Sequence, residues 1–244
     1  MTVNVSIADL ETMIAHRGAS FDAPENTAAS IALAIDRGAK IIEFDVRETV
    51  DGKLLLFHDN DLKRLCNLTG TFEALSGEDA ADLDVGSWFS KGDFSSEKPP
   101  SLAASITQCL EGGAIPLIEH KSGSPDAYAK VIKDLDVVDK VIVQSFDWEF
   151  IAEIRKRLPK LKVGALGSKK LSDRKAQLTE LKPDWVGWSQ KDITKADIDW
   201  LKEKSFHIAI WTVNDPARAA WLLDSGADKI ITDRPKFLSD NLSQ

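Results

Sequence analysis

The stretch that most constrains this chain is residues 41–59, IIEFDVRETVDGKLLLFHD, where two carboxylates interrupt an apolar strand. Side chains alternate between the two faces of a strand, so Glu43 and Asp45 share one face, and the apolar residues around them share the other. A buried carboxylate must be paired or bound to a metal ion, because its charge is costly to remove from water. Strand interiors are also depleted in Asp and Glu. We therefore expect a functional site here and disfavour the alternative, an amphipathic hairpin with incidental polar residues.

The strand is followed by Asp51-Gly52, the dipeptide that most favours a two-residue type I′ hairpin loop. With these two residues as the loop, counting back along both arms places Asp45 opposite His58. The turn is thus predicted to bring a histidine back onto the two carboxylates.

Length and charge narrow the range of folds and ligands. A chain of 244 residues can form one large α/β domain or two small ones, and α/β barrels reach this size as one domain. The net charge of −8 has no long single-sign run, which argues against a nucleic-acid partner but allows an anionic small-molecule substrate. The two cysteines, Cys66 and Cys109, have no metal-binding or disulfide spacing.

The beginning of the chain, MTVNVSIADLETM, lacks the basic stretch and apolar core of a signal peptide. No apolar run approaches the about 20 residues that span a bilayer. We therefore expect a cytoplasmic protein without a membrane partner.

Strands and helices alternate along most of the chain, and we predict a (β/α)8 TIM barrel. An open doubly wound sheet is the competitor, but HRGASFDAPEN after the first strand is not a glycine-rich phosphate turn. The number of barrel strands is eight only if residues 54–58 form the returning arm of the hairpin and not a strand of the barrel. Helices are predicted from Asn26 or Thr27 to Gly38, over 102–110, 125–135, 148–158, 171–181, 195–204 and 216–223, and after Pro235. The predicted barrel strands are 12–15, 40–46, 115–121, 140–145, 161–165, 184–188, 207–213 and 229–232.

Residues 60–100 are the least regular part and are rich in Gly, Ser and Asp. Long loops in compact domains are usually functional, and Trp88, Phe89 and Phe94 favour a packed cap over the alternative of a disordered linker. The expected organisation is one catalytic TIM-barrel domain over 1–244, with 47–100 as an inserted hairpin and cap.

In such a barrel the active site forms at the carboxyl ends of the strands. Glu43, Asp45 and Glu119 would converge there, and three oxygen ligands suit one hard divalent cation, namely Mg²⁺, Ca²⁺ or Mn²⁺. His120 alternates to the outer face and is expected to pack between strand and helix.

Four further side chains are expected near this cation, and a fifth is expected against the substrate. His16 and His58 are the natural pair for acid and base catalysis near neutral pH. Arg17 and Lys121 add positive charge suited to binding a phosphate. Trp211, at the end of the seventh predicted barrel strand, is a candidate to contact the carbons of the substrate.

Nine motifs, in order from residue 14 to residue 235, resemble the glycerophosphodiester phosphodiesterase family. The resemblance implies a TIM barrel, a divalent metal and catalytic histidines at His16 and His58. It also implies hydrolysis of small phosphodiesters such as glycerophosphocholine and glycerophosphoethanolamine to sn-glycerol 3-phosphate and an alcohol. The motifs are His16-Arg17-Gly18, Pro24-Glu25-Asn26-Thr27, Glu43-x-Asp45, Asp51-Gly52, His58-Asp59, Glu119-x-Lys121, Ser145-Phe146-Asp147, Trp211-Thr212-Val213-Asn214 and Thr232-Asp233-Arg234-Pro235.

The chain departs from the family pattern at His120, where the family usually has an apolar residue, and at Leu65-Cys66-Asn67, where threonine is common. Three alternatives stay open: a lysophospholipase D acting on lysophospholipids, a noncatalytic glycerophosphodiester-binding barrel, and a metal-dependent aldolase-type barrel. The first needs an apolar approach for an acyl chain, and no interfacial amphipathic helix is evident. The second and third need no histidine pair beside the metal.

Overall fold

A closed barrel of eight parallel strands forms the centre of the protein, which confirms the predicted TIM barrel. The computed structural model describes residues 12–242, so the prediction about a signal peptide falls almost wholly outside the described residues. The first strand pairs with both the second and the last, which closes the barrel. The barrel strands are β1 Met13–His16, β2 Ile41–Glu48, β4 Ile115–His120, β5 Ile142–Ser145, β6 Lys162–Gly167, β7 Trp185–Ser189, β8 His207–Trp211 and β9 Lys229–Thr232.

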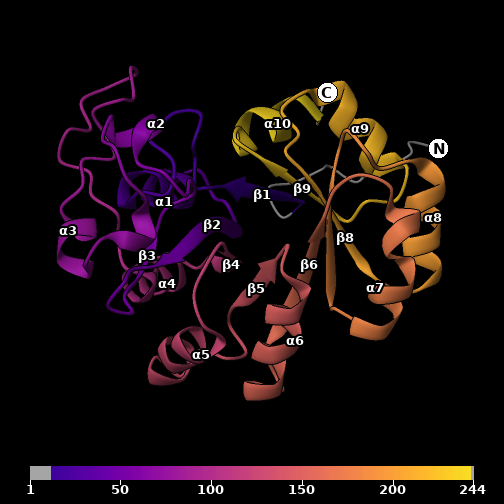
Figure 1. Ribbon diagram of the computed structural model, residues 1–244. Coiled ribbons are helices and arrows are strands. Elements are labelled where there is room, and N and C mark those ends of the chain that lie inside the picture. The colour runs from indigo at the N-terminus through magenta and orange to yellow at the C-terminus, as the bar shows by residue number, and fades with distance from the viewer. Residues whose placement is uncertain (1–11, 243–244) are drawn as a thin grey trace.

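Helices follow the barrel strands and surround them (Figure 1). Most begin at a side-chain cap: Thr27 and Thr194 form capping boxes, and Ser124 and Asp215 precede a proline in the first turn. No helix between residues 12 and 242 is long and apolar enough to cross a bilayer. The outer helices are α1 Ala28–Asp36, α4 Leu102–Glu111, α5 Pro125–Asp134, α6 Trp148–Arg157, α7 Lys175–Leu181 after the 3₁₀ turn η2 Leu171–Arg174, α8 Lys195–Glu203, α9 Pro216–Asp224 and α10 Pro235–Leu242.

The alternation of side chains divides the barrel into an inner and an outer core. Ile41 of β2 and Leu117 of β4 lie in the inner cluster, whereas Ile42 and Ile118 pack outward against helices. Since Glu43, Asp45 and Glu119 continue the inner rows, the strand pattern itself directs them into the barrel mouth. His120 points outward, as predicted: its ring stacks on Phe150 of α6 at 3.5 Å.

The predicted hairpin is present, but its loop contains three residues and not two. The Thr49 N–H donates to Lys53 O at 2.9 Å, so residues 50–52 form the loop. Of the loop residues, Gly52 alone has a positive φ, +82°, whereas a type I′ loop needs positive φ at Asp51 as well. The Thr49 hydroxyl also donates to the Asp51 carboxylate at 2.6 Å, which favours the longer turn.

The longer loop shifts the hairpin register by one residue, so the predicted facing of Asp45 and His58 is wrong. The Phe57 N–H donates to Asp45 O at 3.0 Å, and the returning strand, β3 Leu54–Leu56, ends before His58. His58 still lies at the active face, because the chain leaves the ladder after β3 and turns inward. Its position therefore depends on contacts outside the sheet.

The segment after β3 packs as a cap, as predicted, on the indigo-to-magenta side of the molecule (Figure 1). Its elements are α2 Lys63–Cys66, the 3₁₀ turn η1 Phe72–Ala74 and α3 Gly77–Ala81. The cap has a small core of its own, in which Phe57 stacks on Phe72 at 4.6 Å between ring centroids. It is thus a packed layer attached to the hairpin, and it does not link two domains.

Candidate active site

Three buried carboxylates from β2 and β4 meet at the mouth of the barrel. Asp45 and Glu119 are direct partners in the β2–β4 register, and Glu43 lies two residues before Asp45. Each offers an oxygen within 4.8 Å of the other two, and each residue is less than 9% exposed. The predicted cation-binding residues are therefore brought together.

The charge balance of this cluster is suited to a cation. Burial raises the pKa of Glu43 well above its ordinary value, and repulsion from Asp45 and Glu119 adds to the effect. Burial and Asp45 also raise the pKa of Glu119. Among the described residues, no group hydrogen-bonds Glu43 Oε1 or Asp45 Oδ1. Buried oxygens of crowded carboxylates that accept no hydrogen bond are the donor set that Mg²⁺, Ca²⁺ or Mn²⁺ requires, so these residues fit the expected metal.

Asp45 differs from its two neighbours because its pKa is lowered and not raised. Burial alone would raise its pKa, but the charges of Arg17 and Lys121 outweigh burial and hold the pKa well below its ordinary value. Arg17 Nε lies 3.0 Å from Asp45 Oδ2, and the Asn26 side-chain amide donates to the same oxygen at 2.9 Å. Asp45 is thus held ionised and fixed in orientation.

The two predicted phosphate-binding residues line the cavity and are themselves paired with carboxylates. Arg17 has a positive φ, +56°, and donates from its backbone to Glu43 at 3.0 Å and from its side chain to Glu25 at 2.7 Å. Lys121 donates to Glu119 at 2.8 Å. Both cations therefore lie within the ionic network around the carboxylates.

His16 is held by a carboxylate from the far end of the chain. Its Nδ1 lies 2.6 Å from Asp233 Oδ1, and its Nε2 lies 4.0 Å from Glu43. The Asn214 amide and the Ser20 hydroxyl also donate to Asp233, at 2.6 and 3.2 Å. Burial would raise the pKa of Asp233, but His16, Asn214 and Ser20 together lower it. Asp233 therefore stays ionised beside the ring.

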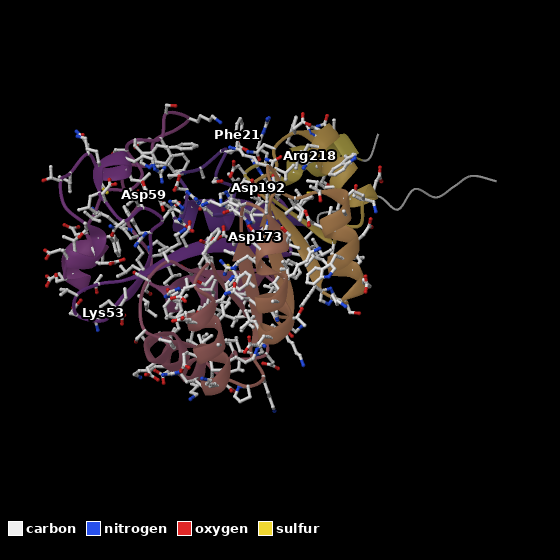
Figure 2. The ribbon with its side chains drawn as sticks, turned by 45° about the vertical axis from the view of Figure 1, so that its right-hand side comes forward. Phe21, Lys53, Asp59, Asp173, Asp192 and Arg218 are labelled. Carbon is white, nitrogen blue, oxygen red and sulfur yellow. The ribbon has the colours of Figure 1, made fainter. Side chains whose placement is uncertain are left out.

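His58 is held by its neighbour in sequence, and that neighbour is held by the cap. Nδ1 of His58 lies 2.7 Å from Asp59 Oδ1, and Arg64 of α2 donates to Asp59 Oδ2 at 2.6 Å. Figure 2 shows Asp59 on the cap side of the molecule and Arg218 on the opposite side. Burial lowers the pKa of His58, which favours the neutral ring. In both histidines Nδ1 is bound to a carboxylate, so Nε2 is the nitrogen left for chemistry.

One cavity of about 250 Å³ contains these groups and has two unlike halves. Its ionic half is formed by His16, Arg17, Glu43, His58, Glu119 and Lys121. Its apolar half is formed by Phe146, Leu166, Trp211 and Ile231, with Gln144 and Thr212 at the border.

The apolar half is shaped around Trp211, whose ring meets Phe146 edge to face at 5.5 Å. Gly187 of β7 makes room for the neighbouring Leu166, because a Cβ there would lie 2.5 Å from the Leu166 side chain. The Trp211 indole N–H and the Gln144 side-chain oxygen are buried, and neither has a hydrogen-bond partner within residues 12–242.

Reasoning from sequence missed the residues that hold the site together. Asp233 and Asn214 occur at strand ends, and Asp59 directly follows His58, so position alone could have pointed to them. Glu25 belongs to one of the motifs named above, but the sequence did not show that it pairs with Arg64, which lies 39 residues away.

Comparisons with known proteins agree with this geometry. The family model described as "Glycerophosphoryl diester phosphodiesterase family" matches residues 16–237. A glycerophosphodiester phosphodiesterase of Bacillus subtilis is 30% identical, with 95% of this chain and 86% of that protein covered. One from Caldanaerobacter subterraneus is 29% identical, with 93% and 95% covered.

Solved structures show the same architecture. A phosphodiesterase of Oleispira antarctica, in complex with the product sn-glycerol-3-phosphate, superposes with a TM-score of 0.87. It is 26% identical, and the match covers 96% of this chain and 97% of that one.

Proposed function

Because this chain belongs to the glycerophosphoryl diester phosphodiesterase family and is therefore a phosphoric diester hydrolase, we propose how its site performs the reaction. It hydrolyses small glycerophosphodiesters, such as glycerophosphocholine and glycerophosphoethanolamine, to sn-glycerol 3-phosphate and an alcohol. One observation supports this most strongly: two carboxylate-bound histidines and three convergent carboxylates line or border a single small cavity.

Glu43, Asp45 and Glu119 would hold one divalent cation, Mg²⁺, Ca²⁺ or Mn²⁺. When bound, such an ion supplies positive charge that polarises a phosphoryl oxygen. Occupancy would also relieve the repulsion among these carboxylates, which burial makes severe.

Arg17 and Lys121 would neutralise the remaining charge of the phosphodiester. A phosphodiester resists hydrolysis because its anionic oxygens repel nucleophiles and its leaving group is a poor one, so fixed positive charge is the main requirement of catalysis. Both side chains line the cavity, and their carboxylate partners hold them in place before substrate arrives. Such preorganisation lowers the cost of arranging charge during the reaction.

His58 would act as base and His16 as acid in the first step. Burial keeps His58 neutral, so its Nε2 can take a proton from the attacking oxygen, which belongs to water or to the substrate's own 2-hydroxyl. His16 faces the ionised Asp233, which compensates the positive charge of a protonated ring. Its Nε2 proton passes to the alcohol oxygen as the P–O bond breaks. Loss of either histidine should lower kcat by about 10²–10⁴-fold.

Trp211 would contact the glycerol carbons, with the phosphate directed toward the ionic half. The cavity volume of about 250 Å³ suits a glycerol head and disfavours a lysophospholipid. A noncatalytic binding barrel would not need both histidines held at Nδ1 by carboxylates.

The test is release of glycerol 3-phosphate from glycerophosphocholine by the full chain, with and without EDTA. We expect release that stops in EDTA and returns with excess Mg²⁺, Ca²⁺ or Mn²⁺, while His58→Ala remains slow throughout. Lysophosphatidylcholine serves as the comparison substrate. Activity that survives EDTA would refute the metal, and preferred release of choline from the lysolipid would favour the lysophospholipase D alternative.

A further inference from the structure

We infer that Arg64, on the cap, is a positioning residue that fixes His58 through Asp59 and ties both to the barrel through Glu25. The inference deepens the proposed function and rests on it, since it takes His58 to be the base. Arg64 itself lies behind Asp59, and it is absent from the residues that line the cavity.

The guanidinium of Arg64 joins two carboxylates at once. Nε and Nη2 donate to Asp59 at 2.6 and 3.2 Å, and Nη1 and Nη2 donate to Glu25 at 2.8 and 2.7 Å. Four hydrogen bonds from one planar group fix both the distance and the angle between the carboxylates. The point charge of a lysine could not reproduce this geometry.

Glu25 connects the cap to the metal-binding residues. It is 8% exposed, and it accepts from Arg17 as well as from Arg64. Arg17 in turn contacts Asp45 at 3.0 Å. A continuous series of ion pairs therefore runs from Asp45 through two arginines to Asp59. The Pro24-Glu25-Asn26-Thr27 motif supplies its central member.

His58 needs this support because the sheet does not hold it. β3 ends at Leu56, two residues earlier, and within residues 12–242 the His58 backbone accepts a single side-chain hydrogen bond, from Arg47 Nε at 3.0 Å. The Asp59 side chain is 19% exposed, so water would compete for it once Arg64 is removed. A fixed Asp59 carboxylate keeps the proton on His58 Nδ1, and Nε2 is then the proton acceptor. A carboxylate that can rotate would not maintain this tautomer.

The first test uses Arg64→Gln and Arg64→Lys, each made in the wild-type and in the His58→Ala protein. Lys63→Gln, the adjacent exposed cation on α2, is the matched control. We expect both Arg64 variants to lower kcat for glycerophosphocholine by about 10-fold or more, a part of the about 10²–10⁴-fold loss for His58 itself, with KM little changed. In the His58→Ala background the same substitutions should change kcat less than about 2-fold, because the residue through which Arg64 acts is gone.

The second test does not depend on turnover. In ¹⁵N-labelled metal-free protein, NMR of the His58 ring should show the Nδ1–H tautomer in the wild type and in Lys63→Gln. A shift toward Nε2–H is expected in Arg64→Gln. An unchanged tautomer, or an equal kcat loss in both backgrounds, would overturn the inference and would mean that Arg64 only anchors the cap to the barrel. A wild-type protein inactive on every glycerophosphodiester would refute the proposed function, and the ring spectrum would still decide the role of Arg64.

Discussion

The two halves of the cavity are built by different physical means. In the ionic half the cationic side chains are held by carboxylates: Arg17 by Glu25 and Asp45, and Lys121 by Glu119. In the apolar half, Trp211 and Ile231 are held by packing within the inner apolar cluster of the barrel. A network of charges transmits the loss of one member to the others, whereas packed side chains act nearly independently. Substitutions in the ionic half should therefore alter turnover, and those in the apolar half should alter substrate selection.

The largest effect is expected at the carboxylate cluster. Glu43→Gln should reduce turnover to background, because it removes one of the three proposed cation ligands. Among the described residues no group hydrogen-bonds Glu43 Oε1, so this oxygen is available to a cation. The fold should persist, since burial already disfavours the charged form of Glu43. Activity, circular dichroism and calorimetric metal binding are the measurements.

Glu119→Gln should behave in the same way. Glu48→Gln, at the last residue of β2, serves as the control. Unfolding of both cluster variants, or full turnover in either, would contradict the difference drawn between the halves.

A smaller loss is expected at the partner of His16. Asp233→Asn retains a hydrogen-bond acceptor but removes the negative charge, so kcat should fall by about 10²-fold, within the range for a general acid, with KM nearly unchanged. Steady-state kinetics check this. Asp173→Asn, on the exposed 3₁₀ turn η2, is the control and should be neutral. A rise in KM alone would mean that Asp233 shapes the cavity and does not assist His16.

Substitution of Trp211, in the apolar half, should change KM. Trp211→Ala removes the ring against the glycerol carbons and should raise KM for glycerophosphocholine by about 10-fold, the effect of about 1–3 kcal/mol of lost contact. Bis(p-nitrophenyl) phosphate has no glycerol, so its KM should change little. Equal losses on both substrates would show that the Trp211 ring is structural.

The smallest effect is expected at the hairpin tip. Gly52 has φ +82° and open space around it, since a Cβ at this position would have Glu48 Oε1, 3.7 Å away, as its nearest neighbour. Gly52→Val should therefore cost about 1–3 kcal/mol of unfolding free energy through backbone strain alone. We expect kcat to stay within about 3-fold of wild type, because Asp59 and Arg64 hold His58 beyond the end of β3.

Gly70→Val, at another positive-φ glycine with nothing near its Cβ, provides the control for strain without the hairpin. Denaturant unfolding and kcat are measured together. A kcat as low as that of His58→Ala would mean that the hairpin register, and not the cap, positions the histidine.

Local patterns in the sequence were sufficient to predict the barrel and the meeting of the three carboxylates at its mouth. Alternation in β2 and β4 places Glu43, Asp45 and Glu119 on inner rows, and the strand count closes at eight. The alternation of side chains and the succession of strands are local regularities of the sequence. They can therefore be recognised without knowing which strands pair. The cap of α1 at Thr27 and the outward facing of His120 were predictable for the same reason.

The hairpin register and the partners of each charged group depend on tertiary contacts. Asp51-Gly52 is compatible with two loop lengths, and the choice depends on the Thr49 side chain and on Gly77 of the cap, whose N–H donates to Asp51 at 2.8 Å. His16 and Asp233 lie 217 residues apart and meet because β1 pairs with β9 when the barrel closes. Local patterns specify which way a side chain points along its own strand. Which opposite charge it meets there depends on closure of the barrel and packing of the cap, which bring distant segments together.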